Sequence, residues 1–294
     1  MQRKNEFNFY LFYCKGIIYY MRIFFVINNS KLEAIDNAKK AIHILNALGC
    51  ECAVERNVFD FFKKCAVADN IDNICTYDFI IAVGGDGTIL AASEHAAKYD
   101  IPVLGINSGH MGFLCGLERH DLEKLEKILK NQYNEKKRML LEVEYNKNKY
   151  IAVNDVVFTK PVLGSLIDLK VFESDNFVIE YRADSVLFST PTGSTAYALA
   201  NGGPVADPNL DFISMAPICA HSLASRTYLF SKNAELVAKI GNRNKTHMVV
   251  DGVELNLLDK GSEVKIRKSD KKLKLVYLED IPFFDLVRKK FLPN

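Results

Sequence analysis

A short glycine-rich segment carries one ionisable side chain where a phosphate would be expected to bind. Gly84-Gly85-Asp86-Gly87-Thr88 lies between an apolar run and a segment with helical character. Glycines let the backbone approach an anion closely and adopt positive φ, and successive N–H groups at a helix start attract a phosphate. Asp86 would repel that phosphate unless it serves a metal, a proton or a hydroxyl. The alternative interpretation is a tight turn in which Asp86 caps the helix.

This segment does not match the two commonest phosphate-binding patterns. It is not a P-loop, because no Gly-Lys-Ser or Gly-Lys-Thr follows, and it is not G-x-G-x-x-G. A second glycine loop comes 20 or so residues later, where NSGHMGFL, residues 107–114, contains Gly109 and Gly112. It follows an apolar run, so it is predicted to lie at the edge of a parallel sheet where ligands bind in open α/β folds. Phe113 in this loop could equally lie against an adenine or belong to the core.

Asn154 and Asp155 stand together inside the hydrophobic run AVNDVVF. Buried polar groups need hydrogen-bond partners. An amide offers both a donor and an acceptor, which suits an adenine edge, and a carboxylate can accept two hydrogen bonds from a ribose diol. From the residues alone, a turn or bulge is the favoured interpretation, and a nucleoside contact is the functional one.

The longest polar stretch is YRADSVLFSTPTGSTAYALANGGP, residues 181–204. Its hydroxyl side chains cannot all be buried without hydrogen-bond partners. The turn over residues 191–193 would present them at one edge. These hydroxyl residues are Ser189, Thr190, Thr192, Ser194 and Thr195.

Alternating strand and helix patterns must position the two glycine loops. Residues 21–118 are predicted to form an α/β nucleotide-binding domain, Rossmann-like, with a parallel sheet covered by helices on both faces. The apolar runs predict strands at Arg22–Asn28, Glu51–Val58, Asp78–Val83 and Pro102–Asn107, and the helical spacing predicts helices at Leu32–Leu48 and Thr88–Lys98.

The pattern changes after residue 118. An amphipathic helix is predicted at Asp121–Lys130, with Leu122, Leu125 and Leu129 facing inward. From Leu140 onward, short runs of period two predict strands: LLEVEYN, YIAVNDVVF, LIDLKVFES and FVIEYRADSVLFST. Residues 119–274 are therefore predicted to be a β-rich, antiparallel, sandwich-like domain, and residues 275–294 are expected to pack back onto the first domain.

The composition favours some classes of protein over others. The 294 residues suffice for two domains, and a net charge of +2 gives no indication of a nucleic-acid surface. The seven cysteines include no C-x-x-C pair, which favours reduced thiols in a cytosolic protein over a disulfide framework or a zinc site.

Residues 1–20 are unusually aromatic. Lys15 and Arg22 interrupt this segment, so no run of about 18 apolar residues exists, and no signal-peptide cleavage site follows. We therefore expect a cytoplasmic protein with no membrane partner. Two explanations are expected for residues 1–20. Either they form a dispensable extension, or the start of the protein is mis-assigned and Met21 is the true first residue.

Two of these motifs together resemble one family of kinases. The GGDGT segment after a strand is similar to that of NAD kinases, diacylglycerol and sphingosine kinases, and phosphofructokinases. The stretch YRADSVLFSTPTGSTAY, residues 181–197, closely resembles the signature of NAD kinases, and the bacterial type in particular. The resemblance extends from Met21 to the C-terminus. It favours a nucleoside contact for Asn154 and Asp155 over a turn or bulge, because NAD kinases carry an Asn-Asp or Asn-Glu pair in this setting.

The resemblance assigns roles to individual residues. The dinucleotide and phosphate site would contain Asp86 and Gly87, with their neighbours Gly84, Gly85 and Thr88. The adenosine would be held by Asn154 and Asp155, the substrate pocket would be lined by Arg182 and Asp184, and Phe113 would lie beside the dinucleotide. The wall around NAD would be formed by Thr195, Ala196, Tyr197, Ala198, Leu199 and Ala200.

Two residues depart from the family pattern. Ser185 replaces the usual glycine after Asp184, which puts the local loop geometry in question. Val253 follows Asp251-Gly252 where the family often has glutamine, so the sequence gives little reason to assign a role to Asp251.

The resemblance implies transfer of a phosphoryl group from ATP to the adenosine ribose 2′-hydroxyl of NAD, giving NADP. Asp86 would be the catalytic base, and Mg²⁺ would be held mainly by the nucleotide and water, since the sequence offers no cage of carboxylates. NAD and ATP would be the small-molecule partners of a homo-oligomer, a dimer or tetramer. The alternatives are a lipid kinase of the diacylglycerol type that shares the GGDGT loop, and a non-catalytic nucleotide sensor.

Overall fold

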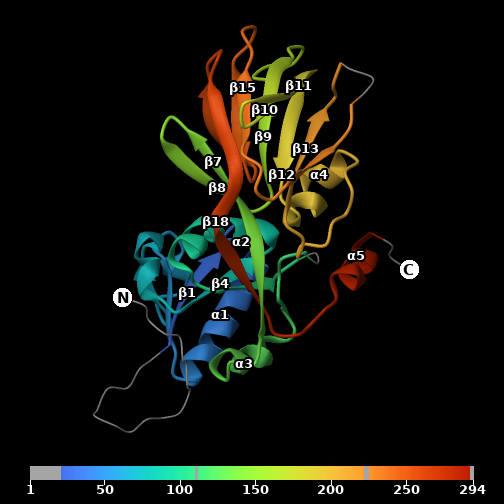
Figure 1. Ribbon diagram of the computed structural model, residues 1–294. Coiled ribbons are helices and arrows are strands. Elements are labelled where there is room, and N and C mark those ends of the chain that lie inside the picture. Colours follow the sequence, from blue (N-terminus) through green and yellow to red (C-terminus); the bar gives the residue numbers. More distant parts are fainter. Residues whose placement is uncertain (1–20, 110–111, 222–224, 292–294) are drawn as a thin grey trace, which may run out of the picture. The chain divides into compact units, whose positions relative to one another are not determined.

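The computed structural model describes residues 21–109, 112–221 and 225–291 (Figure 1). The chain divides into two compact units: residues up to Lys136 together with those from Lys274 onward form the first, and Lys137–Leu273 form the second. Each unit has its own hydrophobic core. The expectation for residues 1–20 concerns a part of the chain outside the described residues.

A parallel sheet forms the centre of the first unit, with strand order β18-β5-β4-β1-β2-β3, in which β18 spans Glu263–Tyr277. The pairings β1–β2, β1–β4, β4–β5 and β5–β18 are parallel, as the alternation of strands and helices predicts. Both β4 and β5 are buried along their whole length, which is typical of a sheet covered on both faces. The strands are β1 (Arg22–Ile27), β2 (Glu51–Glu55), β3 (Val67–Asp69), β4 (Phe79–Gly84), β5 (Val103–Asn107) and β6 (Leu117–Glu118).

Helical segments of the first unit pack on this sheet. The apolar residues of α1 recur every three or four positions, and Ile35, Ile42 and Leu45 pack into one cluster with Phe25 of β1. The helices are α1 (Leu32–Ala47), α2 (Asp86–Tyr99), α3 (Glu126–Leu129) and α5 (Phe283–Phe291), and the 3₁₀ segments are η1 (Phe59–Phe61), η2 (Ile71–Thr76) and η3 (Leu122–Leu125).

The prediction of a single helix at Asp121–Lys130 is wrong. The segment forms a 3₁₀ turn, η3, followed by one short α-helical turn, α3. Its fully buried apolar residues are Leu122, Leu125 and Ile128, while Leu129 is partly buried against the same core. A spacing of exact threes suits the 3₁₀ helix, which has 3.0 residues per turn, better than the α-helix.

The second unit contains two layers of antiparallel strands, as predicted. One layer contains β11, β10, β15 and part of β18, with β7 and β8 beside them, and the other has the order β14-β13-β12-β9-β16-β17. Inner residues of both layers, such as Leu169 and Phe188, belong to one core. The strands are β7 (Asn134–Tyr145), β8 (Asn148–Ala152), β9 (Asp155–Thr159), β10 (Ile167–Glu173), β11 (Asn176–Ala183), β12 (Ser185–Ser189), β13 (Phe212–Ile218), β14 (Tyr228–Ser231), β15 (Leu236–Ile240), β16 (Thr246–Val250), β17 (Val253–Leu258) and β18 (Glu263–Tyr277).

Two runs predicted as single strands each change layer. YIAVNDVVF breaks at Val153 and Asn154, so that β8 pairs with β7 whereas β9 pairs with β12 and β16. FVIEYRADSVLFST breaks at Asp184, so that β11 pairs with β10 whereas β12 pairs with β9 and β13. The polar residues at both breaks are thereby placed between strands of different layers.

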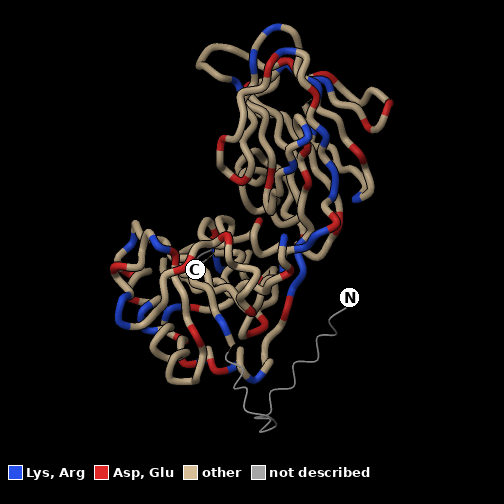
Figure 2. Tube along the Cα trace, turned by 90° about the vertical axis from the view of Figure 1, so that its left-hand side faces the viewer, with Lys and Arg blue, Asp and Glu red and all other residues tan. Residues whose placement is uncertain are grey.

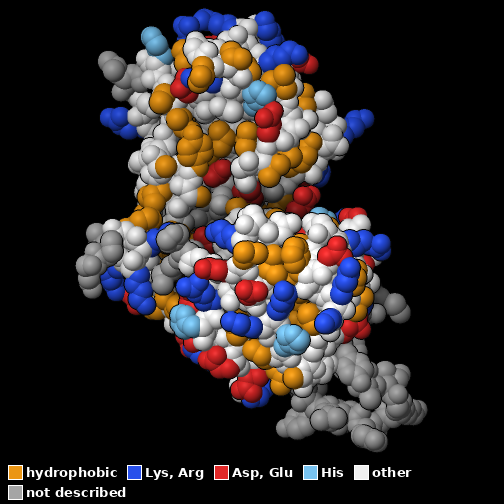
Figure 3. Space-filling view, turned by 180° about the vertical axis from the view of Figure 1, so that it is seen from behind, with side chains coloured by type: hydrophobic (Ala, Val, Ile, Leu, Met, Phe, Trp, Pro, Cys, Tyr) orange, Lys and Arg blue, Asp and Glu red, His pale blue; other side chains and the backbone are white. Residues whose placement is uncertain are grey.

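Positions of basic and acidic residues are interspersed along the described chain, as Figure 2 shows. On the face of the molecule seen in Figure 3, basic and acidic side chains of the first unit are likewise mixed. Charge alone therefore does not mark one binding surface there. None of the helices in the described part of the chain is long and apolar enough to cross a membrane.

Candidate active site

The GGDGT segment turns from β4 directly into α2. Gly84 ends the strand, Gly85 is extended, and the helix begins at Asp86, two residues earlier than predicted. A Cβ on Gly84 would lie 2.1 Å from Oγ1 of Thr88, so the strand end can accept only glycine without a shift of that side chain. Thr88 Oγ1 in turn accepts the N–H of Gly85 at 3.4 Å.

The glycines of this segment do not adopt positive φ, contrary to the prediction. They provide space instead. A Cβ on Gly85 or Gly87 would meet no atom within 4 Å, so the backbone at the start of α2 is open to the approach of another molecule. N–H groups in the first turn of a helix have no partner within the helix and attract anions.

The second glycine loop holds the carboxylate of Asp86. Phe113 N donates to its Oδ2 at 2.9 Å, and Leu114 N donates to its Oδ1 at 3.0 Å. A Cβ on Gly112 would lie 2.1 Å from Oδ1, so this close approach requires glycine. The two loops meet because β4 and β5 are parallel neighbours whose last residues, Gly84 and Asn107, are in register.

The thiol of Cys115 completes the surroundings of Asp86, with Sγ 4.0 Å from Oδ1. Burial, and next the negative charge of Asp86, raise the pKa of this thiol, so it remains protonated at neutral pH. Asp86 is therefore surrounded on this side by groups that donate hydrogen bonds.

Phe113 lies under the C-terminal helix. Its ring is only 9% exposed, and the ring centroids of Phe283 and Phe291 on α5 lie 6.1 and 5.7 Å away. The ammonium group of Lys290 lies 4.2 Å from the centroid of the same ring. Phe113 thus already has aromatic and cationic partners within the first unit.

In the second unit, Asn154 and Asp155 line a cavity of about 470 Å³. Volumes of this size are typical of small-molecule sites. Alternate residues of β9 face the cavity, which follows from the period of two along a strand. The lining residues are Asn154, Asp155, Val157, Thr159, Ser185, Ala196, Tyr197, Val249, Asp251 and Gly252.

Asp155 is a buried carboxyl group without a neutralising partner. It is 5% exposed, and among the described residues no side chain donates a hydrogen bond to its carboxyl group or bonds to the side-chain amide of Asn154. Burial, and next the negative charge of Asp251, raise the pKa of Asp155 to about 7. Buried groups with strongly shifted pKa values in a cavity are candidates for functional residues.

This raised pKa predicts how stability depends on pH. An aspartate in an unfolded chain has a pKa of about 3.9, so between about pH 4 and pH 7 the folded protein retains a proton that the unfolded chain releases. The contribution of Asp155 to stability therefore falls as the pH rises through this window. We expect Asp155→Asn to be more stable than the wild type at pH 8 by at least about 1.4 kcal/mol, the equivalent of one pKa unit.

Denaturant unfolding of both proteins at pH 4, 6 and 8 measures this difference. The advantage of Asp155→Asn should be much smaller at pH 4, where the carboxyl group of Asp155 is protonated in the folded state and about half protonated in the unfolded state. A difference in stability that stays constant across the three pH values would show that Asp155 does not titrate near pH 7.

The hydroxyl-rich stretch braces the neighbouring backbone rather than facing solvent. Thr190 Oγ1 donates to Val153 O at 2.6 Å, and Ser189 Oγ donates to Asn154 O at 3.1 Å. A Cβ on Gly193 would lie 2.2 Å from Asn154 O, so the turn of the STPTG segment packs tightly against this carbonyl. Two of the five hydroxyls, those of Ser189 and Thr190, therefore support the Val153–Asn154 backbone, whereas Ser194 bonds to Ala206 and Thr195 to Thr192 O.

The six residues expected to form a wall around NAD are divided by the structure. They span η4 (Thr192–Thr195) and α4 (Tyr197–Ala200), and only Ala196 and Tyr197 line the cavity. Ala198 is buried in a small apolar cluster with Val157 and Leu187. The remaining three, Thr195, Leu199 and Ala200, do not line the cavity.

Arg182 and Asp184 also differ in their positions. Arg182 is exposed on β11, whereas Asp184 lies between β11 and β12 and pairs with Lys160, Nζ to Oδ1, at 2.6 Å. Neither lines the cavity. Lys160 was not predicted, and no pattern in the sequence would have connected it to Asp184.

Ser185, the departure from the family glycine, lies in the cavity wall. Its Oγ donates to Oγ1 of Thr159 at 2.7 Å. It begins the regular strand β12, and its φ is not positive, so the backbone here does not require glycine. The substitution thus leaves the local geometry intact and adds a hydroxyl group to the cavity wall.

Sequence reasoning missed Asp251. Its carboxylate contacts the backbone of the Asn154–Asp155 segment, with Oδ2 2.7 Å from Val153 N. The signal that could have located it is the Asp-Gly pair between two alternating strands, which is typical of a two-residue hairpin turn. The pair places Asp251 beside the cavity, whatever residue follows Gly252.

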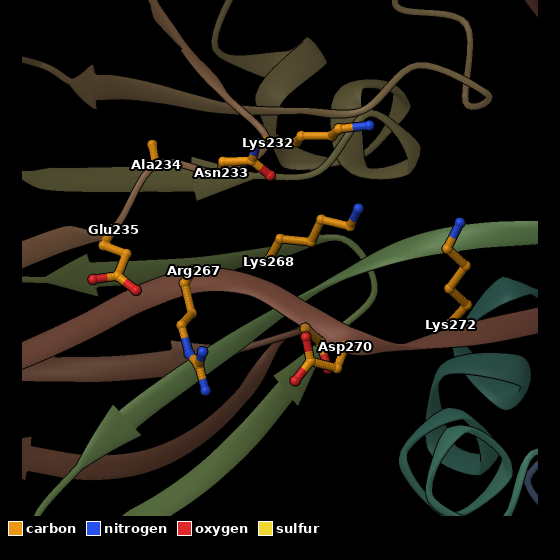
Figure 4. Close-up of a pocket in the computed structure, with 9 residues that line it drawn as sticks. Lys232, Asn233, Ala234, Glu235, Arg267, Lys268, Asp270 and Lys272 are labelled. Carbon is orange, nitrogen blue, oxygen red and sulfur yellow. The ribbon is translucent and has the colours of Figure 1, made fainter.

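A second cavity, of about 330 Å³, is bordered by basic side chains (Figure 4). Lys232 and Lys268 each lie 3.4 Å, Nζ to Oδ2, from Asp211, and Arg267 binds Glu142 at 2.7 Å, Nη2 to Oε1. These three cations already have carboxylate partners. Its lining residues are Lys232, Asn233, Ala234, Glu235, Arg267, Lys268, Ser269, Asp270 and Lys272.

Comparison with known proteins gives consistent matches along most of the chain. The family model for the ATP-NAD kinase N-terminal domain matches residues 23–136, and that for the ATP-NAD kinase C-terminal domain matches residues 153–278. An NAD kinase of Caldanaerobacter subterraneus is 39% identical over 220 residues, which are 72% of this chain and 78% of the relative. An NAD kinase of Legionella pneumophila is 40% identical over 222 residues, 73% of this chain and 75% of the relative.

Two solved structures share the fold. Yeast NADH kinase complexed with NADH superposes with a TM-score of 0.84 at 22% identity, covering 93% of this chain and 87% of the yeast chain. An NAD kinase from Archaeoglobus fulgidus in complex with ATP superposes with a TM-score of 0.74 at 22% identity, covering 92% and 98%. At this identity the likeness establishes the fold of the chain.

Proposed function

The chain belongs to the NAD kinase family, and we propose that it transfers a phosphoryl group from ATP to the 2′-hydroxyl of the adenosine ribose of NAD, giving NADP. The observation that carries this proposal is the carboxylate of Asp86, which stands at the start of α2 and is oriented by two backbone N–H groups. Family membership also decides between this activity and that of lipid kinases with a GGDGT loop.

Asp86 is assigned the role of catalytic base. A carboxylate has about four lone-pair sites, and the hydrogen bonds from Phe113 and Leu114 use two of them, so another remains to accept the hydroxyl proton. Phosphoryl transfer passes through a loose transition state in most analyses, so positioning and charge neutralisation dominate. The nucleophile then loses its proton late, and a positioned carboxylate can accept it at that point.

The start of α2 is assigned to the phosphates. The open backbone at Gly85 and Gly87 and the N-terminal end of α2, which attracts anions, support this assignment. Among the described residues, no three His, Cys, Asp or Glu side chains are arranged to hold a metal ion. The proposal takes MgATP as the substrate, with Mg²⁺ held mainly by the nucleotide and water, as is usual for this ion.

Asn154 and Asp155 are assigned to the adenosine of NAD. Hydrogen bonds to a charged group contribute about 1.5–3 kcal/mol, so Asp155→Ala should weaken NAD binding by about ten- to a hundredfold. Isothermal titration calorimetry measures the Kd. Asp259→Ala is a suitable control, because it removes an exposed carboxylate of the same unit, paired only with Lys245, and should leave the Kd unchanged. Equal affinity of Asp155→Ala and the wild type would make the pair structural.

A homo-oligomer, dimer or tetramer, is part of the same proposal. Exposed apolar side chains on and before α5 support it, since Phe284 is 51% exposed and Phe291 is 41% exposed. Apolar side chains gathered on one helix are typical of a surface that packs against another chain.

A further inference from the structure

One carboxylate binds three consecutive backbone N–H groups beside the cavity. Asp251 Oδ2 accepts the N–H of Val153 at 2.7 Å, and its Oδ1 accepts those of Asn154 and Asp155 at 2.8 and 3.1 Å. The backbone N–H of Asp251 donates to Asp155 O at 3.0 Å. A single residue on another hairpin thus holds the segment that carries both proposed adenosine ligands.

The hairpin turn fixes where this carboxylate lies. Val250 and Val253 pair, so Asp251 and Gly252 alone connect β16 to β17. Their φ angles are +47° and +82°, as a type I′ turn requires at both central positions. Asn-Gly and Gly-Gly make this turn equally well. The turn therefore explains the backbone conformation but not the negative charge.

The backbone of Val153–Asp155 is fully satisfied without the side chains of Asn154 and Asp155. All three N–H groups bind Asp251, the carbonyl of Val153 accepts a hydrogen bond from Thr190 Oγ1, and that of Asn154 accepts one from Ser189 Oγ. The carbonyl of Asp155 accepts the N–H of Asp251. Both side chains are consequently left to face the cavity.

The negative charge at Asp251 works against its neighbour. Its presence raises the pKa of Asp155, and burial raises the pKa of Asp251 itself while the three backbone hydrogen bonds lower it. A neutral turn residue would avoid this repulsion. The repulsion is opposed by the hydrogen bonds, because charge-assisted hydrogen bonds to three adjacent N–H groups are stronger than neutral ones.

We propose that Asp251 is a positioning residue for the NAD kinase reaction, which fixes the Asn154–Asp155 segment so that both side chains meet the adenosine of NAD. This inference rests on the proposed function of Asn154 and Asp155. Asp251 acts through the backbone of that segment and is not assigned a contact with substrate.

Two variants separate the carboxylate from the turn. Asp251→Gly keeps the positive φ at no steric penalty and removes all three hydrogen bonds, whereas Asp251→Asn keeps the turn and one acceptor oxygen. In the protein without nucleotide, amide hydrogen exchange at Val153, Asn154 and Asp155 should be at least tenfold faster in Asp251→Gly. The exchange rates of Asp251→Asn should lie between those of Asp251→Gly and those of the wild type. Unchanged exchange in both variants would overturn the inference.

Steady-state kinetics then test the link to NAD. Asp251→Gly should raise the KM for NAD at least tenfold, with Asp251→Asn intermediate, while the KM for ATP and kcat change by less than threefold. Asp259→Asn, which removes a carboxylate at the other end of β17, should match the wild type in every value. Because a merely structural defect would lower kcat or the amount of folded enzyme instead, a selective rise in the NAD KM supports the positioning role.

Failure of the inference is distinguishable from failure of the proposed function. If Asp155→Ala weakens NAD binding but Asp251→Gly binds NAD normally, the site assignment stands and the positioning role of Asp251 is overturned. If neither variant affects NAD binding, the assignment of Asn154 and Asp155 to adenosine fails, and the inference fails with it.

Discussion

Asp86→Asn should lower kcat by about a hundredfold or more, while the affinity for NAD changes much less. General-base catalysis contributes about 10²–10⁴ in rate, and an amide cannot accept the proton of the ribose hydroxyl. Asparagine has nearly the same shape, and its oxygen can still accept the N–H of Leu114, so the loop should remain folded. Turnover at saturating NAD and ATP, with NAD affinity measured separately by calorimetry, tests this expectation.

Glu94→Gln provides the matched control for this variant. Glu94 is an exposed carboxylate on the same helix, α2, so its replacement changes the net charge equally without touching the loop. This control should retain wild-type kcat. Near-normal turnover in a correctly folded Asp86→Asn protein would contradict the assignment of Asp86 as the base and leave it the role of a helix-start residue.

Gly112→Ala should also reduce kcat, by about ten- to a hundredfold. The new Cβ would lie 2.1 Å from Oδ1 of Asp86, closer than any contact can be, so either the carboxylate or the loop must move. Displacing a catalytic group by about 1 Å can lower a rate by about 10². The KM for NAD should change less than kcat, because Gly112 lies in the first unit and the proposed adenosine ligands lie in the second.

Gly109→Ala is the control in the same loop. Among the described residues, a Cβ at Gly109 would meet the ammonium group of Lys31 at 3.5 Å, and the φ of Gly109 is not positive. We expect wild-type kinetics for this variant. Equal activity of Gly112→Ala and Gly109→Ala would show that the position of the Asp86 carboxylate is not critical for catalysis.

The sequence predicted the first unit well because its signals are local. Buried parallel strands are continuous apolar runs, and β4 and β5 stood out for that reason, with a glycine loop after each. The start of α2 was harder to predict, because glycine and aspartate within GGDGT are as typical of turns as they are of a first helical turn. Only the contact with Phe113 and Leu114 shows how Asp86 is held.

The second unit was harder to predict because its decisive features are not local. A period of two is the same on either layer, so nothing in FVIEYRADSVLFST marks the change of layer at Asp184. Asp251 is separated from Asn154 by almost 100 residues, and their contact arises only because β9 pairs with β16. Motif reasoning identified Asn154 and Asp155 as candidates but not the residue that holds them.

The role of the hydroxyl-rich stretch was also hard to predict from the sequence. Its composition indicated a polar surface, yet Ser189 and Thr190 are fully buried and bind backbone carbonyls. A motif can be well defined in sequence because it supports a site rather than because it contacts a ligand. Within the stretch that resembles the family signature, only Ala196, Tyr197 and Ser185 line the cavity.

The formation of NADP from NAD and ATP by the purified protein tests the proposed function most directly. An NADP-specific dehydrogenase in the same mixture would convert each product molecule into a change in absorbance at the NADPH wavelength. We expect a rate that is proportional to enzyme concentration, requires both NAD and ATP, and falls about a hundredfold or more in Asp86→Asn. A folded protein that binds both nucleotides but forms no NADP would contradict the proposal and would identify the chain as a nucleotide sensor without kinase activity.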